Sequence, residues 1–373
     1  MSQWAKYMAR GVWRTLLALC LSSLISSCGT LFVPDMMGIA ANADGYQLEP
    51  LPMTFVASFA RGGEDVYLLT PDGRVLRVSD SDLSAPPVDM GSPFPGWGRS
   101  LYVTRSGAIF ASGDHRSLFR STDAGATYQA VLDSPVWRMD EDEQGNLYAG
   151  NYIKDPEHIA TLYKSTDGGD TWSIVFSDAG NHHIHSVRWA DDQKRLYIAY
   201  GDGPTRGQAY SDDRGATWNV INAAPDQGHT DLALTNENLI WASDDRSGRI
   251  FTVDKKSGQT VQTVRDDVMY MWFAVSGADQ VFVGSAVSGP GQHAVLLASS
   301  DAGMTWQKLL ESPETAVDAY SDGMIAESRY LSAGGWLYFT RAGITKQSYR
   351  VRRTPAQSGS PDAGRLQRSL PHN

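Results

Sequence analysis

The eight-residue stretch at positions 165–172, Ser-Thr-Asp-Gly-Gly-Asp-Thr-Trp, decides the fold, because its polar pattern returns three more times along the chain. The other copies are Ser121–Tyr128, Ser211–Trp218 and Ser299–Trp306. Each copy follows a short apolar run, which predicts a strand, a tight turn and a second strand. In such a turn the Asp and Ser side chains bond nearby backbone amides, and Gly adopts a positive φ. The aromatic at the eighth position is expected to fill the space between neighbouring units.

The pattern S-x-D-x-G-x-T-W resembles the Asp box of the bacterial neuraminidase repeat (BNR) family, which includes sialidases, other glycosidases and several non-enzymatic propellers. The resemblance implies structural Asp-box residues at Asp123, Asp167, Asp213 and Asp301. In that family the box is a turn on the face away from the ligand site. We therefore expect replacement of Asp167 with Ala to lower stability without disturbing a binding site.

The glycines of the boxes reveal the length of the repeat. Gly125 and Gly169 are 44 residues apart, Gly169 and Gly215 are 46 apart, and Gly215 and Gly303 are 88 apart, so one unit has lost its box. Its remnant is expected in Lys256–Val261. An aliphatic-aromatic pair marks seven units: Val66-Tyr67, Ile109-Phe110, Leu147-Tyr148, Leu196-Tyr197, Ile240-Trp241, Val281-Phe282 and Leu337-Tyr338. Such a period predicts an all-β, seven-bladed β-propeller of four-stranded antiparallel blades with Asp-box turns.

The first and last units are predicted to meet. Strands of the first unit are expected near 55–60, 66–70, 75–78 and 87–90, and those of the last near 326–331, 337–340 and 349–352. The last unit therefore lacks one strand, and Tyr46–Leu51 is a candidate to complete it and remove an exposed edge. The alternative, in which this segment is only a linker, stays open because Pro50 is unfavourable in a strand.

The first 27 residues have the layout of a secretory signal peptide. A basic flank precedes an apolar run at 16–25 that is too short to span a membrane. The sequence Ile25-Ser26-Ser27-Cys28 resembles a bacterial lipobox, which implies lipidation of Cys28, and Gly29 resembles the residue found after the cysteine of outer-membrane lipoproteins. The alternative is an ordinary secretory signal with an incidental cysteine. The predicted segments are a signal peptide at 1–27, a tether at 28–45, the propeller at 46–353 and a disordered tail at 354–373.

The charge of the chain restricts its partners. The net charge is −10, and removal of residues 1–27 would take away three positive charges and no negative ones, which gives −13. An acidic surface argues against a nucleic-acid partner and gives no attraction to anionic lipid, so membrane contact is expected through the anchor only. A monomer that binds an envelope protein or glycan, either in the periplasm or at the cell surface, fits these features.

Candidate ligand-binding residues lie in the connections between blades, on the face opposite the boxes. They are Trp97, Arg99, Trp137, Arg138, His183, His185, His229, Tyr270 and Trp272. Five of them fall at nearly equivalent positions of the repeat, namely Arg99, Arg138, His185, His229 and Tyr270, which predicts a ring around the channel mouth. Aromatic rings there could stack on a sugar, and Arg and His could supply hydrogen bonds. The alternative is that these polar residues only line a wet mouth and the aromatics fill gaps between blades.

Metal and cofactor sites are not predicted. His183 and His185 would share one face of a strand, and His182 precedes them, but the sequence places no third ligand nearby. Asp178 and Asp231 are carboxylates of a kind that usually caps turns. The longer loops between second and third strands, at 151–159, 201–207 and 286–293, contain no phosphate loop or dinucleotide fingerprint. They are expected to shape a rim.

This chain resembles sialidases in its Asp boxes, but its sequence does not match the sialidase active site. The F/Y-R-I-P motif of sialidases is absent, Tyr349–Arg352 lies at the wrong end, and sialidases have six blades where seven are counted here. An arginine cluster from Arg99, Arg138, Arg188 and Arg329, with Tyr320 or Tyr330 and Glu327 as a nucleophile pair, is conceivable, but nothing in the spacing favours it. No catalytic residue is assigned.

Other members of the family set the remaining alternatives. A second glycosidase group uses two tandem seven-bladed domains with a cleft between them, and this chain has room for one. The size and blade number are similar to those of single-ring assembly factors, such as those of photosystems. The resemblance implies a membrane-anchored, non-catalytic propeller that binds a protein or glycan in the cell envelope. The alternative is a sialidase-like exo-glycosidase with an arginine-rich site at the propeller mouth.

Overall fold

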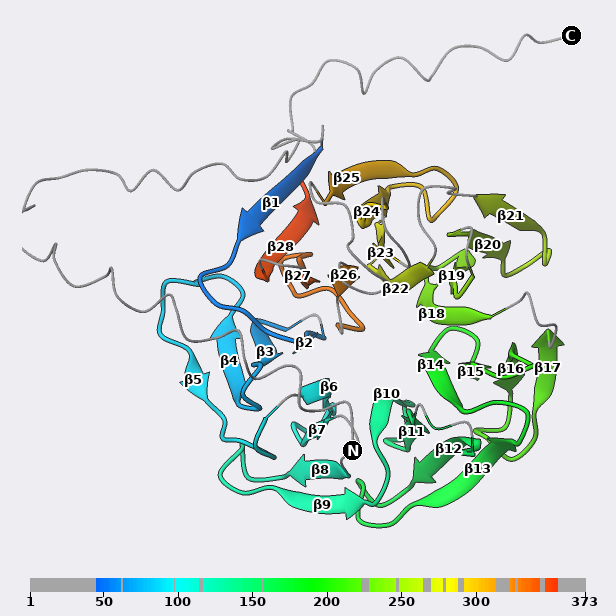
Figure 1. The fold of residues 1–373 in the computed structure, drawn as a ribbon, viewed down its shortest axis with the longest axis horizontal. Helices are drawn as coiled ribbons and strands as arrows, with labels where there is room; N and C mark the ends of the chain where they lie inside the picture. The colour runs from blue at the N-terminus through cyan, green and yellow to red at the C-terminus, as the bar shows by residue number, and fades with distance from the viewer. Residues whose placement is uncertain are drawn as a thin grey trace, which may run out of the picture. The chain divides into compact units, whose positions relative to one another are not determined.

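Short antiparallel strands repeat around a ring in the computed structural model, as Figure 1 shows. The structure describes residues 45–61, 63–96, 98–113, 117–153, 155, 157–222, 228–245, 248–263, 270–277, 280–287, 292–312, 323–325, 328–342 and 346–354. All of them belong to one compact unit, residues 37–373. Their strands form seven groups of four, so the prediction of an all-β, seven-bladed propeller is confirmed.

The seven blades follow one another along the chain, each listed here from its innermost to its outermost strand. Blade 1 contains β2 (Ala57–Phe59), β3 (Asp65–Leu69), β4 (Val75–Ser79) and β5 (Val88–Asp89). Blade 2 contains β6 (Gly98–Val103), β7 (Ile109–Gly113), β8 (Leu118–Ser121) and β9 (Gln129–Leu132). Blade 3 contains β10 (Val136–Glu141), β11 (Leu147–Asn151), β12 (Ala160–Ser165) and β13 (Ser173–Asp178). Blade 4 contains β14 (His183–Ala190), β15 (Arg195–Gly201), β16 (Gly207–Ser211) and β17 (Asn219–Asn222). Blade 5 contains β18 (His229–Leu234), β19 (Asn238–Ser243), β20 (Ile250–Asp254) and β21 (Thr260–Thr263). Blade 6 contains β22 (Tyr270–Ser276), β23 (Val281–Ala286), β24 (Val295–Ser299) and β25 (Gln307–Glu311). Blade 7 contains β26 (Gly323–Ile325), β27 (Leu337–Ala342), β28 (Gln347–Arg353) and β1 (Tyr46–Pro50).

Burial decreases from the inside of each blade to its outside. The second strands β7, β11, β19 and β23 are buried along their whole length, and the aliphatic-aromatic pairs lie on the second strand of all seven blades. A strand covered on both faces needs a nearly continuous apolar run, which explains why these pairs mark the repeat. The fourth strands β9 and β21 contain no buried residue.

The eight-residue turns connect the third and fourth strands of blades 2, 3, 4 and 6. In the first-quoted copy the Ser165 hydroxyl donates to the Asp167 carboxylate (2.7 Å) and accepts from the amide of Gly169 (2.8 Å). The Thr171 hydroxyl donates to the same carboxylate at 2.6 Å. The other three copies repeat these contacts. One local network therefore builds the same turn in four blades.

The aromatic at the end of the turn packs on the preceding blade, as predicted. The Tyr128 hydroxyl donates to the backbone oxygen of Met90 at 2.8 Å, and Trp218 Nε1 donates to that of Val175 at 2.7 Å. Blade 5, which lacks the box, turns differently, because the Asp254 carboxylate accepts from the amide and hydroxyl of Ser257 (2.6 Å each). Each box turn thus connects two strands of its own blade and attaches that blade to the preceding one.

The first strand of the described chain closes the ring. β1 pairs antiparallel with β28 from Tyr46 opposite Arg353 to Pro50 opposite Tyr349, so Tyr46–Pro50 is a strand of the last blade and not a linker. Pro50 is tolerated because it ends an edge strand.

The inner strand of blade 7 differs from the prediction. β26 covers Gly323–Ile325, while residues 328–331, which were expected to be a strand, are irregular. The physical reason is that the Arg329 side chain and backbone oxygen turn into the centre of the ring and bond there to β14.

Several predictions lie outside the described residues: the signal peptide, Cys28, the tether up to residue 44, and the tail after Thr354. Within the described part of the chain, no helix has the length and apolar character needed to cross a membrane.

Candidate functional site

The innermost strand of each blade surrounds the central axis of the ring, as the ribbon in Figure 1 shows. Side chains of these strands approach that axis. Neighbouring strands of a blade run in opposite directions, so the inner strands begin on the face away from the box turns. We call that end of the axis the mouth. The residues that approach the axis form three levels: an aromatic and histidine level at the mouth, a charged level in the middle, and a second charged level near the box turns.

A β-bulge near the start of the inner strand recurs in five neighbouring blades. The pairing register skips one residue in each: Arg99, Trp137, His185, Thr230 and Trp272. A bulge re-aims the side chain of the extra residue, so these five are the equivalent positions at the mouth. The predicted ring therefore holds for two blades and shifts by one or two residues in the other three, where Arg138, His229 and Tyr270 had been expected.

Aromatic side chains meet across the axis at the mouth. The rings of Trp137 in blade 3 and Trp272 in blade 6 have centroids 5.5 Å apart, and Tyr152 packs edge-on against Trp137 at 4.4 Å. The Arg99 guanidinium lies 4.5 Å from the centroid of the Tyr152 ring. Trp272 and Arg99 are half-buried, so part of this cluster faces solvent. The structure thus brings together three of the predicted ligand-binding residues and adds Tyr152 from the loop after β11.

Beside the aromatic cluster, two histidines of β14 face a carboxylate. The Nε2 atoms of His183 and His185 are 2.8 Å apart. The carboxylate of Asp202 lies 3.2 Å from Nε2 of His183 and 3.6 Å from Nε2 of His185. Asp202 follows β15 and has a φ of 66°, an unusual value for a residue other than Gly. In the described part of the chain, this is the one group of three such side chains whose ligand-type atoms all lie within 4.8 Å.

Backbone carbonyls fix the hydrogen positions of the histidine pair. Nδ1 of His183 lies 3.0 Å from the oxygen of Ile153, and Nδ1 of His185 lies 3.0 Å from that of His229. A carbonyl oxygen only accepts hydrogen bonds, so each Nδ1 carries the hydrogen and each neutral ring presents a bare Nε2. Burial lowers the pKa of both histidines, which favours these neutral rings. The pKa of Asp202 is also lowered, since the two neighbouring histidines and Arg206 together outweigh the effect of burial, and it remains a carboxylate.

A second carboxylate stands behind His185. Asp244 lies 3.7 Å from Nδ1 of His185, and burial together with the charge of Asp202 raises the pKa of Asp244 to about 7. His229, a predicted site residue, is buried, and its ring nitrogen contacts Gln208. Its side chain therefore packs behind the site.

Three arginines converge in the middle level. Arg188 donates to the backbone oxygens of Leu232 (2.6 Å) and Ala274 (3.0 Å), and Arg138 and Arg188 each lie 3.9 Å from the carboxylate of Asp231. The charges of these two arginines and of Arg329 together outweigh burial and lower the pKa of Asp231. Of the four arginines considered for a cluster, Arg138, Arg188 and Arg329 meet here while Arg99 lies at the mouth, and the carboxylate of Asp231 already lies among the three.

Arg329 completes this level. Its backbone oxygen accepts from Arg188 at 2.9 Å, and its guanidinium donates to the backbone oxygen of Val187. Burial and the charge of Arg188 lower the pKa of Arg329 to about 10. All three arginines are buried, so they hold the blades together and do not face the solvent.

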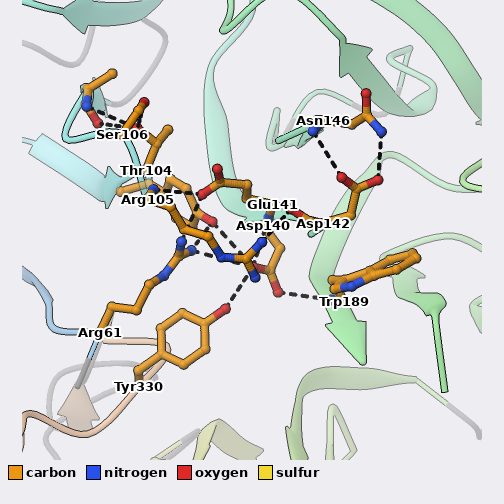
Figure 2. A network of polar contacts seen from close by, with 12 residues as sticks. Arg61, Thr104, Arg105, Ser106, Asp140, Glu141, Asp142, Asn146, Trp189 and Tyr330 are labelled. Atoms are coloured by element: carbon orange, nitrogen blue, oxygen red, sulfur yellow. Dashed lines mark hydrogen bonds and ion pairs between the residues drawn. The ribbon is translucent and has the colours of Figure 1, made fainter. Parts of the chain in front are cut away.

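The level near the box turns is a network around Asp140, shown in Figure 2. Its carboxylate accepts from the Tyr330 hydroxyl at 2.8 Å and from the amide of Trp189 at 2.9 Å. Arg61 forms an ion pair with Glu141 at 2.7 Å. Burial and the charge of Asp140 raise the pKa of Tyr330, which favours the protonated hydroxyl that donates to Asp140. The other members of the conceived nucleophile pair, Tyr320 and Glu327, lie outside the described residues.

The remaining predicted site residues occupy several places. Tyr270 is half-buried at the start of β22, and Trp97 lies outside the described residues. Asp178 caps a turn by accepting from the amide of Gly180 at 2.7 Å, the ordinary role for a loop Asp. Asp202 was missed, although it lies in a loop that had been singled out for its length. The left-handed backbone conformation of Asp202, which no sequence pattern predicted, turns this residue toward the histidines.

Comparisons with known proteins establish the fold. No family model matches the chain. A xyloglucanase from Paenibacillus sp is 29% identical over 203 residues, which cover 52% of this chain and 17% of that protein. The chain therefore spans less than a fifth of the length of this relative.

Solved structures give the same result. A GH74 enzyme from Niastella koreensis superposes with a TM-score of 0.59 at 16% identity, covering 81% of this chain and 53% of that one. The structure of YCF48 bound to the D1 peptide superposes with a TM-score of 0.56 at 13% identity, covering 87% of this chain and 100% of that one. At these identities the chain is similar to both in its propeller fold, and the matched region covers about half of the GH74 chain.

Proposed function

We propose that this chain is a non-catalytic binding propeller of the cell envelope and that its mouth binds a glycan. Lipidation at Cys28 would hold it to the outer membrane. The observation that carries the proposal is the cluster on the face away from the box turns, in which the half-buried Arg99 and Trp272 pack over the buried rings of Trp137 and Tyr152. Aromatic faces stack on sugar rings, and an arginine beside them can bond hydroxyl groups.

The levels beneath the mouth favour a surface site. Buried arginines and carboxylates from opposite blades contact one another there, so a ligand would rest on the mouth and not pass through the ring. A sequence relative is a xyloglucanase, which supports a polysaccharide such as xyloglucan as the ligand class. This chain corresponds to about half of the GH74 chain, which supports binding by a single ring.

A second candidate is a glycoside hydrolase, and one observation favours it. Asp202 and Asp244 flank His185, with the pKa of Asp202 lowered and that of Asp244 raised to about 7. Such a pair could act as general base and general acid in glycoside hydrolysis. The arginine-rich version of this alternative is less favoured, because Asp231 lies among the buried arginines.

A binding and cleavage assay with xyloglucan oligosaccharides tests the proposal. We expect measurable binding by calorimetry, no new reducing ends, and an affinity at least about tenfold lower for Trp272→Ala. The matched control is Trp306→Ala, which removes the same side chain from a box turn on the opposite face. Circular dichroism would verify that both variants fold.

The outcomes separate the candidates. Release of reducing ends, abolished by Asp244→Asn, would establish the hydrolase. Failure to bind on a broad glycan array, together with specific capture of an envelope protein that Trp272→Ala prevents, would replace the glycan with a protein partner. Equal binding by the Trp272 and Trp306 variants would place the site elsewhere.

A further inference from the structure

The histidine pair at the mouth presents an electrostatic conflict. Both Nδ1 hydrogens point at backbone oxygens, so two bare Nε2 lone pairs face each other at 2.8 Å. Two lone pairs repel at that separation unless a cation lies between them. The Asp202 carboxylate adds negative charge to the same point. We propose that His183, His185 and Asp202 bind a divalent transition-metal ion of the zinc class, an inference that goes beyond glycan binding.

The distances fit such an ion. Zinc binds His nitrogen and carboxylate oxygen at about 2.0–2.2 Å, which places neighbouring ligand atoms of a tetrahedral site about 3.3 Å apart. The two Nε2 atoms are 2.8 Å apart, Oδ2 of Asp202 lies 3.2 Å from Nε2 of His183, and Oδ1 lies 3.6 Å from Nε2 of His185. Small side-chain movements would bring all three to equal distances from one ion.

The surroundings of the pair resemble those of other metal-binding histidines. A metal-bound His usually donates its second nitrogen to a carbonyl or carboxylate, which fixes the tautomer and the ring orientation. The oxygens of Ile153 and His229 do this here. Gly201 makes room for the second ring, because a Cβ at that position would lie 2.6 Å from Cε1 of His185.

The backbone also directs the carboxylate. Asp202 occupies a left-handed conformation at φ 66°, which Asp tolerates, and its carboxylate lies beside both histidines. The bulge that skips His185 re-aims its ring. Three residues from two strand ends are thus held in place before any ion arrives.

Charge and access are suitable for a bound cation. The negative charge of Asp202 attracts an incoming cation, against the opposing charges of Arg138 and Arg206 near His185. The Asp202 side chain is 44% exposed, so the ion can enter from solvent. Three protein ligands leave a fourth position for water or for an oxygen atom of a ligand.

Metal titration of the untagged, chelator-treated protein tests the proposal. We expect one Zn²⁺ per chain by calorimetry, and visible absorption from tetrahedral Co²⁺ that Zn²⁺ abolishes. Asp202→Asn, which keeps the shape of an exposed side chain, should weaken Zn²⁺ binding at least about tenfold. The control is Asp155→Asn, because Asp155 also lies beside a histidine, 3.4 Å from Nδ1 of His158, and is similarly exposed.

Three results would overturn the proposal. The first is a wild-type protein that takes up neither Zn²⁺ nor Co²⁺. The second is equal affinity in the wild type and in Asp202→Asn. The third is a ¹⁵N spectrum of the histidines that reveals one proton shared between the two Nε2 atoms and does not respond to Zn²⁺. None of these readouts involves a glycan, so the metal site and the proposed function succeed or fail separately.

Discussion

At the scale of single residues, the box carboxylates are exposed and yet hold the turns of the fold together. Asp213 accepts from the Ser211 hydroxyl (2.8 Å), the Thr217 amide (2.8 Å) and the Thr217 hydroxyl (2.6 Å). The hydrogen bonds from Thr217 and Ser211 lower the pKa of Asp213 to about 2. The ionised form is therefore more favourable in the folded chain than in the unfolded chain.

The first prediction concerns Asp213→Asn and pH. A lowered folded-state pKa contributes stability that is present above the unfolded value of about 4 and is lost as the pH falls toward about 2. We expect the variant to melt about 1–3 °C lower at neutral pH and to approach the wild type near pH 2. Thermal melts between pH 2 and pH 7 measure this difference.

The neighbouring residue provides the control. Asp212→Asn removes the same charge from an exposed ion pair with Arg195 and should change the melting temperature little. If Asp213→Asn and Asp212→Asn had equal effects at every pH, the turn network would not be the source of the stability.

At the scale of strands, the inner strands are tied together by long side chains that cross the axis. Arg188 of β14 donates to backbone oxygens of β18, of β22 and of Arg329 in blade 7 at 2.6–3.0 Å. Backbone oxygens near the axis that lose their donors in a buried place cost free energy. One side chain thus connects blade 4 with three later blades.

The second prediction is that Arg188→Met destabilises the fold. It would leave three acceptors without this donor, and we expect the free energy of unfolding to fall by about 3 kcal/mol or more. Urea denaturation followed by tryptophan fluorescence measures the change. Arg77→Met is the control, because Arg77 lies in a half-exposed ion pair with Asp65, and it should cost about 0–1 kcal/mol. Similar midpoints for the two variants would contradict a role for Arg188 in joining blades.

The same strands explain which parts of the site could be predicted. The repeat pattern located the inner strands, and it placed Arg99 and His185 at equivalent positions. The repeat pattern could not identify the bulge residue. The predicted ring therefore named Arg138, one residue after the bulge residue of its blade, and His229, one residue before the bulge residue of its blade. Bulges depend on pairing between strands and leave no local signature.

Contacts between residues distant in sequence were the other feature of the site that the sequence could not predict. The box turns are built from residues within eight positions, so the sequence alone predicted them. Asp202 reaches the histidines from a loop 17 residues beyond His185, through a backbone conformation that has no residue preference except for Gly, Asn and Asp. The histidines were noticed for their chemistry, and only the loop geometry supplies the third side chain.

At the scale of the whole molecule, the ring depends on pairing between the two ends of the propeller. β1 adds the outermost strand to blade 7, and Glu49 forms an ion pair with Arg350 across the pair at 2.6 Å. Blade 7 also bonds to blade 1, where the Tyr338 hydroxyl donates to Asp80 at 2.7 Å. Closure covers the edge of β28, which would otherwise be free to pair with another chain.

The third prediction is that a disulfide across this pairing stabilises the ring. Gln47 lies opposite Arg352 in the register, and directly opposite residues of antiparallel strands are close enough for a disulfide. Gln47→Cys with Arg352→Cys would close a loop of most of the propeller, for which the upper limit of stabilisation is about 5 kcal/mol. We expect the oxidised variant to melt several degrees above its reduced form. Gln47→Cys with Arg350→Cys is out of register and should gain less. If the out-of-register pair crosslinked as readily and stabilised as much, β1 would not be held in the register that closes the ring.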